Sequence, residues 1–240
     1  MSPFLAFDIE TYGAWQELSP RMQDYLRTRD GYRGLGPDDP RAAPQTVGLL
    51  PGLAQVIAVG LWSPEGERVL ALDPTRAEPL ETQLDGGARL TFFAEEAALL
   101  RSYWDEVAEA HARGARLITF RGRGFDVPML VLRSTVLGVA PRIDLSVPGS
   151  LAPHCDLHEV LGFDQARRPG FSLDYWCEVY SVSSPKGALK GDQVAGAYEA
   201  QRYTEIAAYA LADARATGEV FAHLQPWVEQ IEAQRATTIG

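Results

Sequence analysis

The chain has 240 residues, 46% of them hydrophobic and 22% charged, which is the composition of an ordinary globular protein with ample material for a core. Its 32 acidic residues exceed its 22 basic ones, and the net charge of −10 argues against tight non-specific binding of nucleic acids, which depends on neutralised phosphates. The longest uncharged stretch, about 42–63, is interrupted by glycine and proline, and the N-terminus lacks the basic region of a signal peptide, so we expect a cytoplasmic protein without a membrane span.

The first third of the chain predicts three strands and a loop. Residues 3–9 are mostly apolar and indicate a buried strand. The polar segment 20–50 is rich in Gly, Pro, Asp and Arg and indicates a loop insertion. Residues 55–63 and 67–73 read as two further strands, and the Ser-Pro-Glu-Gly turn between them predicts an antiparallel meander.

Helices dominate the remainder. One short apolar segment, 115–120, predicts another buried strand. Helical periodicity and helix-boundary residues predict helices at 93–112, 125–138, 157–163, 172–181 and 202–222, with a last one after Pro226. This order of elements favours a single mixed α/β domain over residues 1–240.

Two carboxylates lie in or at the end of the first strand. Residues two apart in a strand point to the same face, so Asp8 and Glu10 project side by side, and no Lys or Arg precedes Arg21. Like charges this close raise each other's pKa unless a cation lies between them, and Mg²⁺ prefers carboxylate oxygens. The alternative is that the strand ends at Ile9 and that Glu10 is solvated.

A third acidic residue, Asp126, follows the strand 115–120. The intervening Arg-Gly-Arg-Gly segment, 121–124, combines glycines that let backbone approach a ligand with arginines suited to bidentate phosphate contacts. The alternative is that Asp126 or a neighbour caps the helix that starts near Val127.

The fourth acidic position lies in the long helix 202–222. Tyr209 and Asp213 are four residues apart, so they share a helix face, at the border of the apolar stripe. That position suits the rim of a cleft. The alternative is a surface Asp beside a partly buried Tyr.

The three motifs occur in a characteristic order: FDIET, then RGRGFD, then YALAD. In this the sequence resembles the DEDD superfamily of 3′–5′ exonucleases, tyrosine subclass, and the branch related to the proofreading exonuclease domain of family B DNA polymerases. The segments LLPGLAQVIAVGL, HCDLHEVL and SSPKGALKGDQVAGAY are also similar to that branch. The resemblance covers about 3–10 and 48–222.

The resemblance implies an RNase H-like (DnaQ-like) α/β exonuclease fold with a mixed five-stranded sheet flanked by helices. It implies that Asp8, Glu10, Asp126 and Asp213 bind two divalent ions, Mg²⁺ with Mn²⁺ able to substitute, and that Tyr209 lies beside the attacking water. The implied activity is two-metal-ion hydrolysis at the 3′ end of single-stranded DNA, with release of 5′-mononucleotides.

Further roles are also implied by the resemblance. We expect Thr11, Arg121, Phe125 and Lys186 to contact the substrate and Asp156 to support the site from behind the ligands. The family often has Asn where this chain has Arg121, which changes the group available to hold the 3′-terminal nucleotide. The alternatives are that Lys186 is a solvated side chain and that Asp156 caps the helix at 157–163.

Two other functions remain open on sequence alone: trimming of short RNA, and nucleic-acid binding by a catalytically inactive module. No reader of a 2′-hydroxyl is recognisable, so the residues do not decide between DNA and RNA. The cluster His154, Cys155 and His158 lacks the fourth ligand and the spacing of a zinc site.

Overall fold

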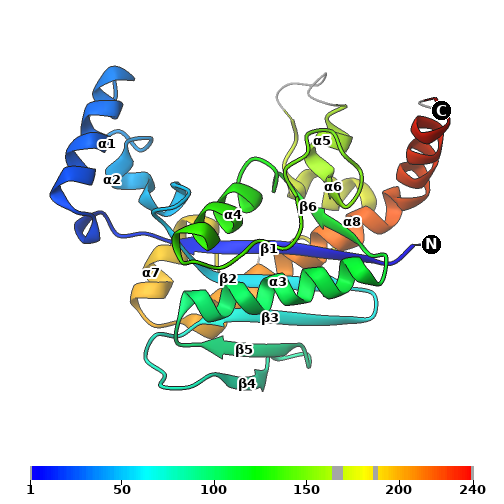
Figure 1. Cartoon of the computed structure of the whole chain (residues 1–240), viewed down its shortest axis with the longest axis horizontal. Coiled ribbons are helices and arrows are strands. Elements are labelled where there is room, and N and C mark those ends of the chain that lie inside the picture. The colour runs from blue at the N-terminus through cyan, green and yellow to red at the C-terminus, as the bar shows by residue number, and fades with distance from the viewer. Residues whose placement is uncertain (1, 164–169, 186–188, 239–240) are drawn as a thin grey trace.

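The computed structural model describes residues 2–163, 170–185 and 189–238. A seven-stranded mixed sheet forms its centre, in the order β4-β5-β3-β2-β1-β6-β7. In Figure 1, α3 and α4 lie in front of this sheet and α8 runs behind it. The fold is therefore α/β, with helices on both faces of the sheet.

The strands are β1 (Phe4–Tyr12), β2 (Gln55–Ser63), β3 (Gly66–Leu72), β4 (Leu80–Gln83), β5 (Arg89–Phe93), β6 (Arg116–Thr119) and β7 (His154–Asp156). The helices are α1 (Pro20–Tyr32), α2 (Ala43–Thr46), α3 (Glu96–Ala112), α4 (Asp126–Val136), α5 (Leu157–Leu161), α6 (Leu173–Tyr180), α7 (Val194–Glu199) and α8 (Tyr203–Thr238). Short 3-10 helices occupy Trp15–Glu17, Val47–Leu49 and Gly191–Gln193. The predicted meander is confirmed, since β1 pairs antiparallel with β2 and β2 with β3.

Two glycines allow α8 to lie directly on the sheet. A Cβ on Gly60 in β2 would stand 2.2 Å from the carbonyl oxygen of Ala210, and one on Gly218 would stand 2.2 Å from the ring of Trp62. Only glycine permits such a close approach of helix and strand. The contact fixes the position of α8, and with it Tyr209 and Asp213, against the centre of the sheet.

The sheet has seven strands and not the five expected. The additional elements are short or lie at its edges: β4 has four exposed residues and pairs only with β5, while β7 has three residues and pairs with β6. Segments this short carry no readable alternation of core and surface residues. The helix expected at 93–112 begins at Glu96, because Phe93 is the last residue of β5.

The expectation of a loop at 20–50 is wrong for its first half. The Ser19 side chain accepts a hydrogen bond from the Met22 N–H, and Pro20 occupies the first helical turn, so α1 starts with strong capping chemistry. Buried Asp30 of α1 accepts a 2.5 Å hydrogen bond from the N–H of Ala43, the first residue of α2, and so connects the two helices. The resulting arm of α1 and α2 projects from the sheet (Figure 1).

The two helices expected on either side of Pro226 form one continuous helix, α8. The residues two before and two after the proline, Leu224 and Val228, are both buried in one core cluster, so packing holds the two halves in line. Pro226 itself is exposed, and its ring faces away from that core. No helix among the described residues is both long and apolar enough to cross a bilayer.

Candidate metal centre

Three carboxylates from two elements converge beneath α8. One oxygen each from Asp8, Glu10 and Asp213 lies within 4.8 Å of the others. Asp8 pairs with Gly60 on β2, and α8 packs against Gly60 because this residue has no side chain. Paired residues of antiparallel strands point to the same face of the sheet, so Asp8 points toward α8, and so does Glu10 two residues further on. The strand continues to Tyr12 and Glu10 is half-buried, so the alternative of a solvated Glu10 after the strand end is wrong.

Asp126 lies deeper, at the start of α4. Phe125 occupies the N-cap position, so Asp126 is not the helix cap. Its carboxylate is only 4% exposed and lies near its own backbone amide and that of Ile9, between Asp8 and Glu10, both of which favour its ionised form. Asp126 is therefore tied to β1 beside the other three carboxylates, although it is not part of the group within 4.8 Å.

The four carboxylates have raised pKa values. Burial, followed by the charge of Asp126, raises the pKa of Asp8 well above its ordinary value, and burial followed by the charge of Asp213 does the same for Glu10. Burial raises the pKa of Asp126 to about 7 and that of Asp213 to about 6. Within the described residues, no Lys or Arg forms an ion pair with these groups. A divalent cation would offset this excess negative charge, and carboxylate oxygens suit Mg²⁺ or Mn²⁺.

Tyr209 lies one helical turn before Asp213 and is hydrogen-bonded to it. Burial and the neighbouring carboxylates, Asp213 first, raise the pKa of the Tyr209 phenol above its ordinary value. The phenol therefore stays protonated near neutral pH and acts as a donor. A Cβ on Gly191 would stand 3.7 Å from its hydroxyl, so the chain around Gly191 passes the mouth of the site.

Asp156 holds the loop that leads to Asp126. Its carboxylate accepts hydrogen bonds of 2.9 Å from the backbone amides of Arg121, Arg123 and His158. It therefore caps α5 and also fixes the Arg-Gly-Arg-Gly loop. The predicted cap of the helix at 157–163 is confirmed, and the same side chain also holds the loop before Asp126.

The backbone conformation of Arg121 is one that suits the Asn usual at this position in the family that the sequence resembles. Arg121 has a φ of 64°, in the left-handed region where Asn is several-fold enriched among residues other than glycine. The Asn usual in the family suits this conformation, and here the bond to Asp156 holds an arginine in it. The Arg121 side chain remains exposed.

The second arginine of the loop has a structural role that sequence reasoning missed. The side chain of Arg123 is only 7% exposed, donates to both oxygens of Glu159 at 3.0 Å, and donates to the carbonyls of Val147 and Ser150. Its guanidinium is therefore committed to fixing the chain between β6 and β7. No short spacing links Arg123 to Glu159, 36 residues away, so the sequence offers no signal for this pair.

The other expected substrate contacts differ in their surroundings. The Thr11 hydroxyl donates to the Gly48 carbonyl at 2.6 Å and ties the end of β1 to the end of the arm. Phe125 is half-buried beside Asp126. Lys186 lies outside the described residues. His154 in the discounted zinc cluster is buried, and its ring nitrogens bond to the Thr119 hydroxyl and the Leu145 carbonyl.

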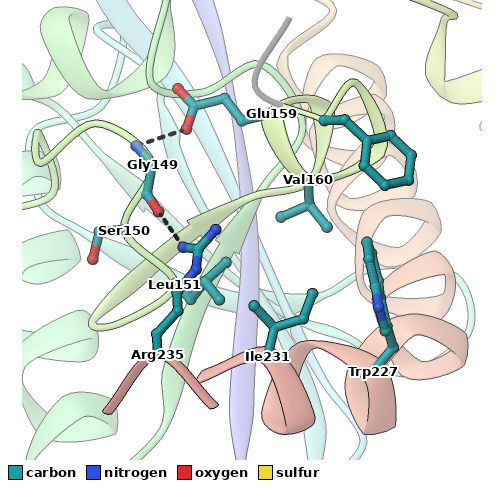
Figure 2. A pocket seen from close by; sticks show the side chains of 9 residues that line it. Gly149, Ser150, Leu151, Glu159, Val160, Trp227, Ile231 and Arg235 are labelled. Carbon is teal, nitrogen blue, oxygen red and sulfur yellow. Dashed lines mark hydrogen bonds between the residues drawn. The ribbon is translucent and has the colours of Figure 1, made fainter. Parts of the chain in front are cut away.

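A separate cavity of about 210 Å³ lies between α5 and the C-terminal part of α8 (Figure 2). It is lined by Gly149, Ser150, Leu151, Glu159, Val160, Phe163, Trp227, Ile231 and Arg235. Arg235 donates to the Gly149 carbonyl at 3.1 Å, and the Gly149 amide donates to Glu159. Trp227 follows Asp213 on α8 by about 21 Å at 1.5 Å per residue, so this cavity is not part of the carboxylate site.

Comparisons with known proteins concern the fold and the family. Residues 149–238 match the model of a family described as predicted 3′–5′ exonucleases related to the exonuclease domain of PolB. The chain is similar in structure to the family B DNA polymerase from the hyperthermophilic archaeon Pyrobaculum calidifontis, with a TM-score of 0.57 and 22% identity over 94% of this chain and 25% of the polymerase chain. The chain thus spans about a quarter of the length of that polymerase. No curated protein matches it.

These findings confirm the resemblance and the fold expected from the sequence, apart from the number of strands. The family model supports a nuclease, and a nucleic acid as its substrate, at the level of a predicted 3′–5′ exonuclease.

Proposed function

We propose that the protein is a metal-dependent 3′–5′ exonuclease that hydrolyses the terminal phosphodiester bond of single-stranded DNA and releases 5′-mononucleotides. The observation that carries this proposal is the convergence of Asp8, Glu10 and Asp213 within 4.8 Å, beside buried Asp126. Four carboxylates without an arginine or lysine partner among the described residues form a poor structural centre and a good cation site.

The four carboxylates would hold two Mg²⁺ ions, with Mn²⁺ able to substitute. When bound, two such ions supply charge stabilisation for both the attacking and the leaving oxygen of a phosphodiester. The protein contributes a fixed frame for them, because Asp8 and Glu10 lie on a central strand and Asp213 on a helix seated against it. A frame of this kind avoids reorganisation during the reaction.

Tyr209 would orient the attacking water. Its hydroxyl is directed into the carboxylate site, where it donates to Asp213, and its raised pKa makes it unsuited to act as a base. Arg121, exposed on the loop fixed by Asp156, would contact a phosphate of the strand, while Thr11, Phe125 and Lys186 are proposed to lie along the terminal nucleotides.

The test is digestion of 5′-labelled single-stranded and duplex DNA and RNA with Mg²⁺, Mn²⁺ or a chelator. The label stays on products shortened from the 3′ end, so a descending ladder reports the polarity. We expect degradation of single-stranded DNA with either metal and none with the chelator. A faster rate on RNA would identify a ribonuclease, and binding without degradation in any metal would identify an inactive binding module.

A further inference from the structure

Five aromatic rings form a continuous run across α6 and α8. Phe171 and Tyr175 are stacked, with ring centroids 4.0 Å apart and an interplanar angle of 16°. Tyr175 contacts Trp176 edge-on at 5.1 Å. The run continues by stacking from Trp176 to Tyr180 at 6.1 Å and from Tyr180 to His223 on α8 at 5.3 Å.

The rings differ in exposure along this run. Tyr175 is 43% and Phe171 37% exposed, whereas Trp176 and Tyr180 are half-buried against the core cluster beneath α8. The inner rings therefore anchor the outer pair, and the outer pair presents aromatic surface to solvent. Large rings held in place by packing lose little conformational entropy when a ligand binds.

The run lies on the helix that packs beside the part of α8 that follows Asp213. Buried Cys177 of α6 belongs to the same core cluster as Ala216 and Val220 of α8, and Tyr180 stacks on His223. Helix α6 packs beside α8 (Figure 1). A strand whose 3′ end occupies the carboxylate site would thus have its preceding nucleotides within reach of Tyr175.

We propose that Phe171 and Tyr175 are a base-stacking platform for the single-stranded segment that precedes the scissile nucleotide. This inference rests on the proposed exonuclease function. The occupant is a single strand, because stacking needs unpaired bases with free faces, and every base has such a face. The platform therefore favours single strands over duplexes without selecting a sequence.

The test measures binding of short 5′-labelled oligodeoxythymidines by fluorescence anisotropy, in the Asp8→Asn background with Mg²⁺ so that the strand stays intact. Tyr175→Ala should weaken binding by about 5- to 30-fold, while Tyr175→Phe, which keeps the ring, should bind within about twofold of the parent. Tyr25→Ala is the matched control, because Tyr25 is 65% exposed but lies on the projecting arm.

A second measurement tests the stacking itself. Abasic nucleotides at the positions that precede the 3′-terminal nucleotide should weaken binding to the parent protein, and Tyr175→Ala should abolish this discrimination. The inference is overturned if Tyr175→Ala behaves like Tyr25→Ala, if abasic and normal strands bind equally to the parent, or if no single strand binds. Because binding is measured without cleavage, loss of the platform is distinguished from failure of the exonuclease function, which the digestion of DNA by the wild-type protein tests separately.

Discussion

Buried or half-buried carboxylates lie on both faces of the same sheet, and their surroundings differ. On the α3 face, Glu96 is 6% exposed, accepts the Val56 N–H at 2.8 Å and forms a bidentate pair with Arg133 at 2.8–2.9 Å. On the α8 face, Asp8 and Glu10 face Asp213, another carboxylate.

The difference shows that burial alone does not identify a functional acid. Glu96 is a satisfied structural group, since each of its oxygens has a donor in the protein. The carboxylates under α8 have each other as neighbours, and burial followed by their mutual repulsion raises their pKa values. A buried acid without a cationic partner stores an unfavourable energy that a bound cation would relieve.

Removal of one charge under α8 should give the largest functional effect. Asp8→Asn should lower the cleavage rate by at least about 10³-fold, because several kcal/mol of transition-state stabilisation are lost with a metal ligand. In the absence of metal the melting temperature should hold or rise, since the substitution relieves repulsion. Digestion of labelled DNA and thermal unfolding in chelator measure the two outcomes, and cleavage at a near wild-type rate would rule out the four-carboxylate model.

Neutralising the buried acid on the α3 face should instead lower the stability of the fold and leave the activity unchanged. Glu96→Gln leaves the Arg133 guanidinium without its charged partner and should destabilise the fold by about 3 kcal/mol. The activity of the folded fraction should be unchanged, because Glu96 lies on the other side of the sheet. Chemical denaturation gives the stability, and a loss of kcat without loss of stability would contradict the division between the two faces.

Tyr209→Phe tests a neutral group inside the same site. Because the hydroxyl would act mainly in the transition state, kcat and kcat/KM should fall together by about 10²-fold with KM little changed. The remaining ring should keep the stability of the fold. Tyr203→Phe, on the same helix, is the matched control and should retain wild-type kinetics; single-turnover cleavage by Tyr209→Phe at the wild-type rate would reduce Tyr209 to a packing residue.

Much of this site follows from local spacing in the sequence. The i, i+2 relation of Asp8 and Glu10 and the i, i+4 relation of Tyr209 and Asp213 fix shared faces before any tertiary contact is known. The periodicities of α3 and α4 and of the strands β2, β3 and β6 are equally local, and the structure has these elements close to the predicted bounds.

The remainder depends on contacts between distant segments. Asp156 lies on a three-residue strand that forms only because β6 offers it an edge, and Arg123 finds Glu159 across 36 residues. Asp174 adds to the raised pKa of Asp213 only because α6 packs against α8. Pro226 predicted a helix end, because the cost of a proline inside a helix can be read from the sequence. The burial of Leu224 and Val228, which offsets this cost, is a tertiary contact that the sequence does not reveal.

The smallest expected effect concerns pH and stability without metal. The pKa of Asp126 is about 7 and that of Asp213 about 6 in the folded protein, above the ordinary value of 3.8. Between pH 4 and 7 the folded state therefore binds more protons than the unfolded state, so stability should fall as pH rises through this window. We expect a loss of at least about 1.4 kcal/mol, the equivalent of one pKa unit.

Asp8→Asn isolates this effect from other titrating groups. Burial lowers the pKa of His154 to about 4, which makes stability rise with pH in the same window, but this contribution is equal in both proteins. The difference in unfolding free energy between Asp8→Asn and wild type should therefore grow in favour of the variant from pH 5 to 7 in chelator. Saturating Mg²⁺ should remove this advantage, because a bound cation favours the ionised carboxylates, and parallel pH profiles in chelator would contradict electrostatic strain under α8.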